Sequence, residues 1–252
     1  MTDWQTWRPI YISLGLALSL NLSGFLPLLP VAAERFEPPN LGRPGRRVGG
    51  GTRGGCAFGN PARLTALLPD SNLGLTTQPY PTFYWFVPQN SAQLVEFSLY
   101  RAETTAAERQ LVYRSTFVPD RAAGIASLKL PESVGLPPLA LEQDYQWSVA
   151  LVCNAEARQQ DLRVDGWIQR IDPTADLAAQ LAREPVAAHA ALYAANGLWF
   201  DAIAQLISLR QGYPQSATVQ ARWAELLTSV GLAEMAEQPI FAEPGQSQET
   251  EN

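Results

Sequence analysis

Histidine and lysine are almost absent, since His189 and Lys129 are the only residues of each type. A Ser-His-Asp or Cys-His mechanism needs a histidine as general base, so any such site would have to use His189. That residue lies in an alanine-rich stretch expected to be helical, and no G-x-S-x-G nucleophile motif occurs. The cysteines and the histidine also lack the spacing of a metal site. The sequence therefore predicts no catalytic, cofactor-binding or metal-binding residue, and we do not expect an enzyme.

Cysteine is also scarce, with Cys56 and Cys153 as the two residues of this type. Two cysteines allow one intramolecular pairing, which suits an oxidising compartment. We predict a disulfide between them, with two free buried thiols as the alternative. A bridge of this length would stabilise the chain by roughly 4 to 5 kcal/mol in the chain-entropy model.

Positive charge is too sparse for a nucleic-acid-binding surface. The formal net charge is −6, with 18 basic and 24 acidic side chains. Binding to nucleic acid requires a concentrated basic face, so nucleic acid is excluded as a partner.

Long apolar runs are absent beyond the N-terminus, where residues 10–29 are mostly apolar. Small residues follow at Val31 and Ala33, the spacing typical of leader-peptidase cleavage. We predict a signal peptide, 1–33, cleaved between Ala33 and Glu34. The mature protein is then periplasmic or secreted and has no stable membrane span. An uncleaved anchor is the alternative, disfavoured by the residues that interrupt the run: Asn21, Gly24, Pro27 and Pro30.

Residues 34–62 are rich in glycine, proline and arginine and predict an irregular lead-in that packs on the domain after it. Residues 49–54 satisfy G-x-G-x-x-G, but a dinucleotide site needs that motif between a strand and a helix. Proline-rich coil precedes it here, so no cofactor is expected. Four arginines of the lead-in form a candidate anion-binding patch for an acidic polysaccharide or a partner's carboxylates: Arg43, Arg46, Arg47 and Arg53.

Residues 63–172 contain short runs of β-branched and aromatic residues separated by turn residues. The predicted strands are 63–68, 82–88, 94–101, 110–118, 124–130, 144–153 and 163–171. Residues 83–87 are apolar on both faces, as in a central strand. This pattern predicts an antiparallel β-sandwich of the immunoglobulin or fibronectin kind.

Alanine and leucine dominate from Pro173 onward, and the apolar period becomes helical. Helices are expected near 174–182, 185–196, 199–211 and 216–230. Gly197 and Gly231 are 34 residues apart, the length of a tetratricopeptide repeat. We therefore predict a small tetratricopeptide-like helical module over 173–232, with an ordinary helical hairpin as the alternative. The tail, 233–252, is acidic and rich in glutamine, which predicts disorder.

Several short motifs occur in a characteristic order along the chain. They are Gly45-Arg46-Arg47-Val48-Gly49-Gly50-Gly51-Thr52-Arg53-Gly54 with Cys56, Leu64-Thr65-Ala66-Leu67, Pro81-Thr82-Phe83-Tyr84-Trp85, Tyr145-Gln146-Trp147 with Cys153, Gly166-Trp167-Ile168-Gln169-Arg170, Trp199-Phe200-Asp201-Ala202, and Gly231-Leu232. In this order, over residues 45–232, the chain resembles a cyanobacterial exported family known as domain of unknown function 928. That family has no established activity, so the resemblance adds no function.

These observations favour an exported, non-catalytic binding or assembly protein of the cell envelope. The helical module and the sandwich surface would contact a protein partner, and an acidic glycan is a second candidate ligand. The candidate partner-binding residues are Arg46, Arg47, Arg53, Trp199, Phe200 and Trp223; for the three aromatics, packing between helices is the alternative. Two other functions stay open: a hydrolase of envelope glycan that uses two carboxylates, and a structural protein that assembles through its sheet edges.

Overall fold

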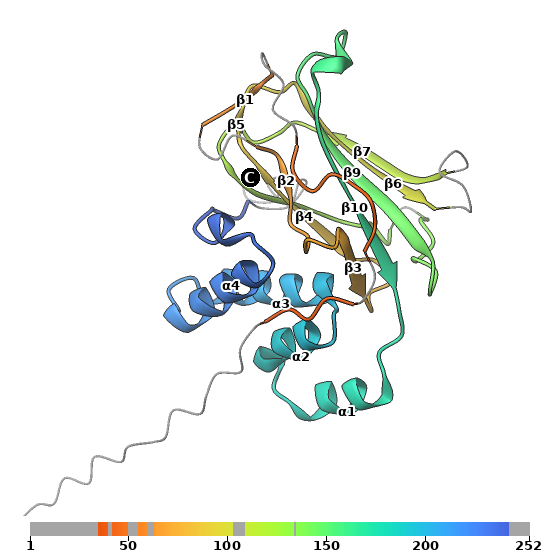
Figure 1. Cartoon of the computed structure of the whole chain (residues 1–252), viewed down its shortest axis with the longest axis vertical. Helices are drawn as coiled ribbons and strands as arrows, with labels where there is room; N and C mark the ends of the chain where they lie inside the picture. Colours follow the sequence, from red (N-terminus) through yellow and green to blue (C-terminus); the bar gives the residue numbers. More distant parts are fainter. Residues whose placement is uncertain are drawn as a thin grey trace, which may run out of the picture. The chain divides into compact units, whose positions relative to one another are not determined.

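The computed structural model describes residues 35–39, 42–49, 55–59, 63–102, 109–133 and 135–241. These residues form a mixed α/β protein with mostly antiparallel sheets and four α-helices (Figure 1). The strands are β1 (Ala57–Phe58), β2 (Thr65–Ala66), β3 (Leu73–Thr76), β4 (Thr82–Val87), β5 (Gln89–Asn90), β6 (Leu94–Arg101), β7 (Gln110–Phe117), β8 (Gly124–Lys129), β9 (Asp144–Val152) and β10 (Leu162–Arg170). The helices are α1 (Ala175–Arg183), α2 (His189–Ala195), α3 (Trp199–Gly212) and α4 (Ala217–Ser229). The predicted signal peptide, 1–33, and its cleavage site lie outside the described residues.

The larger sheet has five strands in the order β3-β10-β9-β6-β7. Its pairs are antiparallel except at one edge, where β3 runs parallel to β10 with Leu73 opposite Trp167. The prediction of a wholly antiparallel arrangement is therefore wrong at this edge, and β3 is absent from the predicted strands. Parallel partners are joined by long connections, so no local turn signal marks the pair. The four residues of β3 include Gly74, which also weakens the strand pattern.

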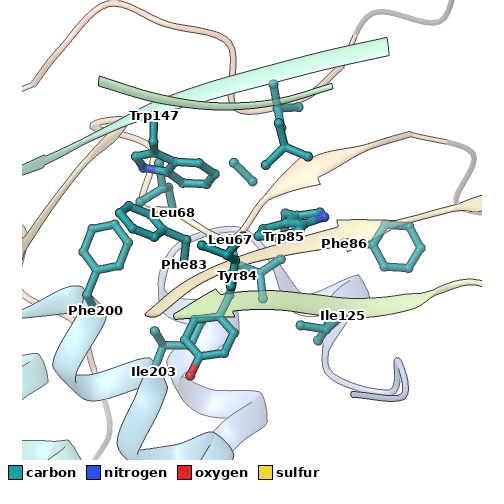
Figure 2. Close-up of a cluster of buried hydrophobic side chains, with 14 of the residues drawn as sticks. Leu67, Leu68, Phe83, Tyr84, Trp85, Phe86, Ile125, Trp147, Phe200 and Ile203 are labelled. Carbon is teal, nitrogen blue, oxygen red and sulfur yellow. The ribbon is translucent and has the colours of Figure 1, made fainter. Parts of the chain in front are cut away.

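The smaller sheet has three antiparallel strands in the order β2-β4-β8. One face of its central strand contacts the larger sheet, because the ring of Phe83 lies 5.0 Å from that of Phe97 and 5.3 Å from that of Trp147. On the opposite face, Tyr84 points toward Ile203 of α3 (Figure 2). The apolar character of β4 on both faces is thus explained: one face meets a sheet and the other meets helices.

The four predicted helices are present, the second as a 3₁₀ turn (Val186–Ala188) followed by α2. Thr174 caps α1, since its hydroxyl accepts a hydrogen bond from the Leu177 amide. Gly197 and Gly231 each follow a helix end with φ of +72°, the left-handed conformation that glycine adopts without strain. These two glycines therefore mark the ends of α2 and α4, with the end of α3 between them.

The helical segment shares its core with the sheets. Trp199, at the start of α3, is fully buried, and its indole N–H donates to the Leu67 carbonyl at 2.8 Å. The ring of Phe200 packs on Phe83 of β4 at 5.5 Å between centroids (Figure 2). A Cβ at Gly74 of β3 would lie 2.6 Å from the Phe200 ring, so glycine is required where this ring passes. The fold of the sheets therefore depends on α3.

The first described part of the lead-in, 35–39, lies on the helices. Phe36 is 4% exposed, and its ring meets that of Trp199 edge-on at 5.2 Å. The Glu37 amide donates to the Ala194 carbonyl of α2 at 3.1 Å. This segment therefore packs on Trp199 and helps to bury it.

The second described part of the lead-in, 42–49, joins the two sheets. The Ala66 amide of β2 donates to the Arg47 carbonyl at 2.8 Å, and the Asp165 amide of β10 donates to the Arg46 carbonyl at 2.9 Å. Adjacent residues of one irregular segment thus bond to strands of different sheets. The expectation that the lead-in packs on the strands holds for these residues.

Cys56 and Cys153 form a disulfide across a sequence separation of 97 residues. This confirms the predicted pairing and excludes the alternative of two free thiols. Cys153 directly follows β9, so the bond fixes the segment around β1 to the end of a central strand.

The C-terminal tail is partly ordered, contrary to the prediction of disorder over 233–252. Ile240 forms a parallel bridge with Ile125 of β8, and the Ile125 amide donates to the Pro239 carbonyl at 2.7 Å. The Phe241 ring fills the space that a Cβ at Gly124 would occupy. A few apolar residues within this acidic segment pack at the edge of a sheet. Composition alone does not reveal this packing, which is why the prediction is wrong for 233–241. Residues 242–252 lie outside the described residues.

Within the described ranges, no helix combines the length and the apolar character needed to cross a bilayer.

Candidate functional site

The three aromatic residues predicted to bind a partner lie in the core. Trp199, Phe200 and Trp223 are 0%, 2% and 1% exposed. The Trp223 indole N–H donates to the Ala236 carbonyl at 3.1 Å, so the ordered tail covers it. The partner-binding prediction is therefore wrong for these three residues, and the alternative of core packing is correct.

Two of the four lead-in arginines are engaged within the protein. Arg43 forms an ion pair with Asp144 at 2.6 Å. Arg47 donates to the carbonyls of Leu68 and Val230 and pairs with Asp70 at 2.7 Å. These contacts fix the lead-in to the rest of the chain, and both arginine side chains stay partly exposed. That Arg47 binds a partner stays a prediction. Arg53 lies outside the described residues.

Arg46 differs from its neighbours because its side chain is exposed and, among the described residues, has no hydrogen-bond or ion-pair partner. It lines a cleft of about 440 Å³ together with Gly45, Arg163 and Asp165. Arg163 is half exposed, and its nearest acidic contact is Glu96 at 4.0 Å. The cleft is therefore lined by two arginines, one from the lead-in and one from β10.

Backbone contacts fix the shape of this cleft. The indole N–H of Trp167 donates to the Pro44 carbonyl at 2.7 Å, and the Asp165 amide donates to the Arg46 carbonyl. Gly45 lies between these two contacts. A Cβ there would lie 1.9 Å from Nδ2 of Asn72 and 2.6 Å from Oδ2 of Asp165. The absence of a side chain at Gly45 thus lets the lead-in lie directly against these two polar groups.

Asn72 is the least satisfied polar residue near the cleft. It is 5% exposed and has a positive φ of 56°, and neither Oδ1 nor Nδ2 has a hydrogen-bond partner in the described part of the chain. A buried amide without partners costs about 1–3 kcal/mol, and both of its polar atoms are covered, with Nδ2 directly against Gly45. The Asp165 carboxylate, which does line the cleft, accepts one hydrogen bond, from Gln146 at 3.2 Å. We identify Asp165, with Arg46 and Arg163, as the candidate binding site.

Sequence reasoning missed Asn72 and Arg163, and it gave Asp165 only as one of many turn carboxylates. A signal for the pair on β10 was present, since Arg163, Asp165 and Trp167 alternate along a predicted strand and so share its polar face. No local signal places Asn72 beside them, because this contact forms between distant parts of the chain.

A second cleft, of about 310 Å³, opens between α3 and the paired ends of β4 and β8. Lys129, Tyr193 and Asp201 contribute to its lining. Asp201 is 5% exposed and accepts hydrogen bonds from the Thr77 amide at 3.1 Å and the Thr77 hydroxyl at 2.5 Å. The carboxylate therefore ties the β3–β4 connection to the first turn of α3, where a negative charge also favours the helix dipole. These contacts assign Asp201 a structural role.

Burial raises the pKa of Asp201 above its ordinary value of 3.8, although the hydrogen bonds from Thr77 and its neighbours act in the opposite direction. The folded chain thus holds this proton more tightly than the unfolded chain. The stabilisation is fully present below the ordinary pKa and is lost as the pH rises through the raised one. Burial, followed by the charge of Asp201, likewise raises the pKa of Tyr193.

Asp201→Asn tests this linkage because asparagine cannot titrate. From about pH 4 to about pH 8, the wild type should lose unfolding free energy relative to the variant. Urea denaturation of both proteins across this range gives the difference directly, since the other carboxylates titrate in both. A difference that stays constant or grows with pH contradicts the raised pKa.

Each of the two clefts is lined by one carboxylate, Asp165 or Asp201. Among the described residues, no group of three histidine, cysteine or acidic side chains could hold a metal ion. His189 places Nε2 3.1 Å from the Glu184 carbonyl and its ring edge-on to Tyr193, as a histidine that stabilises the start of α2 would.

The fold and the clefts define a mixed α/β protein with a charged surface site between an irregular N-terminal segment and a sheet. A family model described as Domain of Unknown Function (DUF928) matches residues 48–240, and the chain belongs to this family. The resemblance carried by the sequence motifs is thereby confirmed. Searches of curated proteins and of solved structures returned no match.

Proposed function

We propose that this protein is an exported, non-catalytic binding and assembly protein of the cell envelope, periplasmic or secreted. One observation carries the proposal: the cleft lined by Arg46, Arg163 and Asp165, in which the Arg46 side chain is exposed and has no partner among the described residues. Arg163 meets Glu96 only at 4.0 Å, so both arginines can contribute to binding an anionic ligand. The binding surface therefore lies on the lead-in and β10, and not on the helices.

A finer description of the architecture is part of the same proposal. The two sheets share a layer of aromatic rings that includes Phe83, Phe97 and Trp147, which supports a β-sandwich of the immunoglobulin or fibronectin kind. Helix ends 34 residues apart, at Gly197 and Gly231, support a tetratricopeptide-like relation between the helical hairpins. In this description the sandwich provides the binding face, and the helices close its core.

Charge reversal in the cleft tests the proposal. Full-length chain with an affinity tag would be recovered after export and used to capture envelope components. Arg46→Glu/Arg163→Glu should lose the components that the wild type retains, because two attractive charges become repulsive. Arg183→Glu is the matched control, because this substitution reverses one exposed charge away from the cleft. The Arg183 guanidinium contacts only a carbonyl of its own helix, α1, among the contacts described.

Three outcomes count against a cleft that binds. Capture that is equal in wild type and double variant places binding elsewhere. Loss of capture in the Arg183 control as well indicates non-specific electrostatics. A wild type that captures no component but self-associates in light scattering favours the alternative of assembly through sheet edges, of which β7 is one.

A further inference from the structure

The cleft carries groups for two kinds of ligand chemistry at once. Arg46 and Arg163 offer planar N–H donors, which pair with carboxylates in a bidentate way. Asp165 lies between them and adds a negative charge that would repel a simple anion such as phosphate. A ligand that fits must therefore combine an anionic group with hydrogen-bond donors that can approach Asp165.

The Asp165 carboxylate narrows the choice further, because it only accepts hydrogen bonds and an alcohol group can donate one. Asp165 keeps acceptor capacity beyond its bond from Gln146. Hydroxyl groups on the same molecule as a carboxylate thus match the polar groups present, whereas an acidic peptide offers few such donors.

A row of side chains extends from the cleft across the exposed face of the larger sheet. Trp167 of β10 and Tyr100 of β6 each lie opposite Gln146 of β9, so the three share one face. Strands in a sheet are about 4.8 Å apart, which separates Trp167 from Tyr100 by about 10 Å. Both rings are partly exposed. Two aromatic surfaces at this interval, with an amide between them, suit a chain of sugar rings, whose C–H faces are apolar and whose edges are polar.

Hydrogen bonds connect this row to the cleft. Gln146 donates to Asp165, and Arg109 donates to the Gln146 carbonyl oxygen. The Arg109 guanidinium lies 5.9 Å from the centre of the Tyr100 ring, and Arg114 donates to the Tyr100 hydroxyl at 3.0 Å. The side chains of the row are therefore held in place before a ligand arrives, which lowers the entropy cost of binding.

We propose that this site binds an acidic oligosaccharide. A uronate ring occupies the cleft with its carboxylate on Arg46 and Arg163 and its hydroxyls on Asp165. The adjoining sugar rings continue over Trp167 and Gln146 to Tyr100. The proposal rests on the proposed function, since it names the ligand class of the same cleft.

Calorimetric titration of the exported full-length chain at physiological salt tests the proposal with four probes: D-galacturonate, a galacturonate oligomer, dextran and poly-L-glutamate. The oligomer should bind more tightly than the single sugar, and dextran should not bind. Arg46→Gln/Arg163→Gln should weaken both uronates about tenfold or more. Tyr100→Ala should weaken the oligomer about three- to tenfold and leave the single sugar unchanged. Arg183→Gln, far from the row in sequence, should change neither.

Circular dichroism of each variant shows whether it is folded. Tyr100→Ala replaces a partly exposed ring, so its effect on the affinity for the oligomer tests the proposal separately from folding.

The remaining outcomes separate the two proposals. In one outcome, poly-L-glutamate binds as tightly as the oligomer and depends on the same arginines. That result rejects the saccharide as the ligand class and retains the proposal of a carboxylate-binding protein. Uronate binding that is unaffected by Arg46→Gln/Arg163→Gln overturns the saccharide assignment to this cleft. If no probe binds while envelope capture still depends on the arginines, the saccharide is wrong and the binding function stands. If no probe binds and envelope capture does not depend on the arginines, both the saccharide proposal and the proposed function are rejected.

Discussion

Trp199→Ala is expected to lower the free energy of unfolding by about 3–5 kcal/mol, the range for removing a large buried aromatic side chain. Trp199 is fully buried at the point where the lead-in, the helices and β2 meet. Its removal opens a cavity beneath Phe36 and also leaves the Leu67 carbonyl without the indole donor. A loss of this size is a large part of the total stability of a domain, so the variant should be close to unfolding at 37 °C.

Urea denaturation followed by far-ultraviolet circular dichroism measures this effect without relying on tryptophan fluorescence. Trp199→Phe is the matched control, because it keeps most of the packing and loses mainly the hydrogen bond, so its cost should be smaller. If Trp199→Ala costs less than about 1 kcal/mol, the helical segment does not stabilise the sheets as we describe.

Removal of the disulfide is expected to have the second large effect. Cys56→Ala/Cys153→Ala should lower the unfolding free energy by about 2–5 kcal/mol, because the bond constrains the unfolded chain over a separation of 97 residues. The loss should appear mainly as a lower denaturation midpoint with an intact cleft at low urea. Galacturonate titration of the double variant under native conditions checks the second point.

Urea denaturation of the wild type with and without reductant provides the control. Reductant should shift the wild-type midpoint toward that of Cys56→Ala/Cys153→Ala and leave the double variant unchanged. Equal midpoints for oxidised wild type and double variant would contradict a stabilising role for the bond.

Much of the secondary structure could be predicted because its signals are local. The alternation at Tyr145 to Cys153 identified β9, and the helical period with glycines at 197 and 231 identified the helices. The disulfide followed from there being two cysteines, since two allow one pairing. Membership in the family followed from the order of short motifs and is confirmed over residues 48–240.

The errors arose where the outcome depends on contacts between distant residues. Trp199, Phe200 and Trp223 lie in apolar stretches of predicted helices whether those helices meet a partner or the chain's own sheets, so their exposure could not be predicted. The same holds for Ile240, which has an acidic sequence context and yet pairs with β8. Among the lead-in arginines, composition could not separate Arg47, which is bound by carbonyls, from Arg46, which is not.

The sequence alone determined the longer strands and the helices, the disulfide and the polar alternation of Arg163, Asp165 and Trp167, because each depends on spacing along the chain or on residue count. The tertiary structure alone decided the parallel pairing of β3, the burial of the helical aromatics and the meeting of Gly45, Arg46 and Asn72 at β10. The physical reason is that hydrophobic burial and hydrogen bonding across the chain select among arrangements that local propensity leaves equivalent. The candidate binding site belongs to this second group.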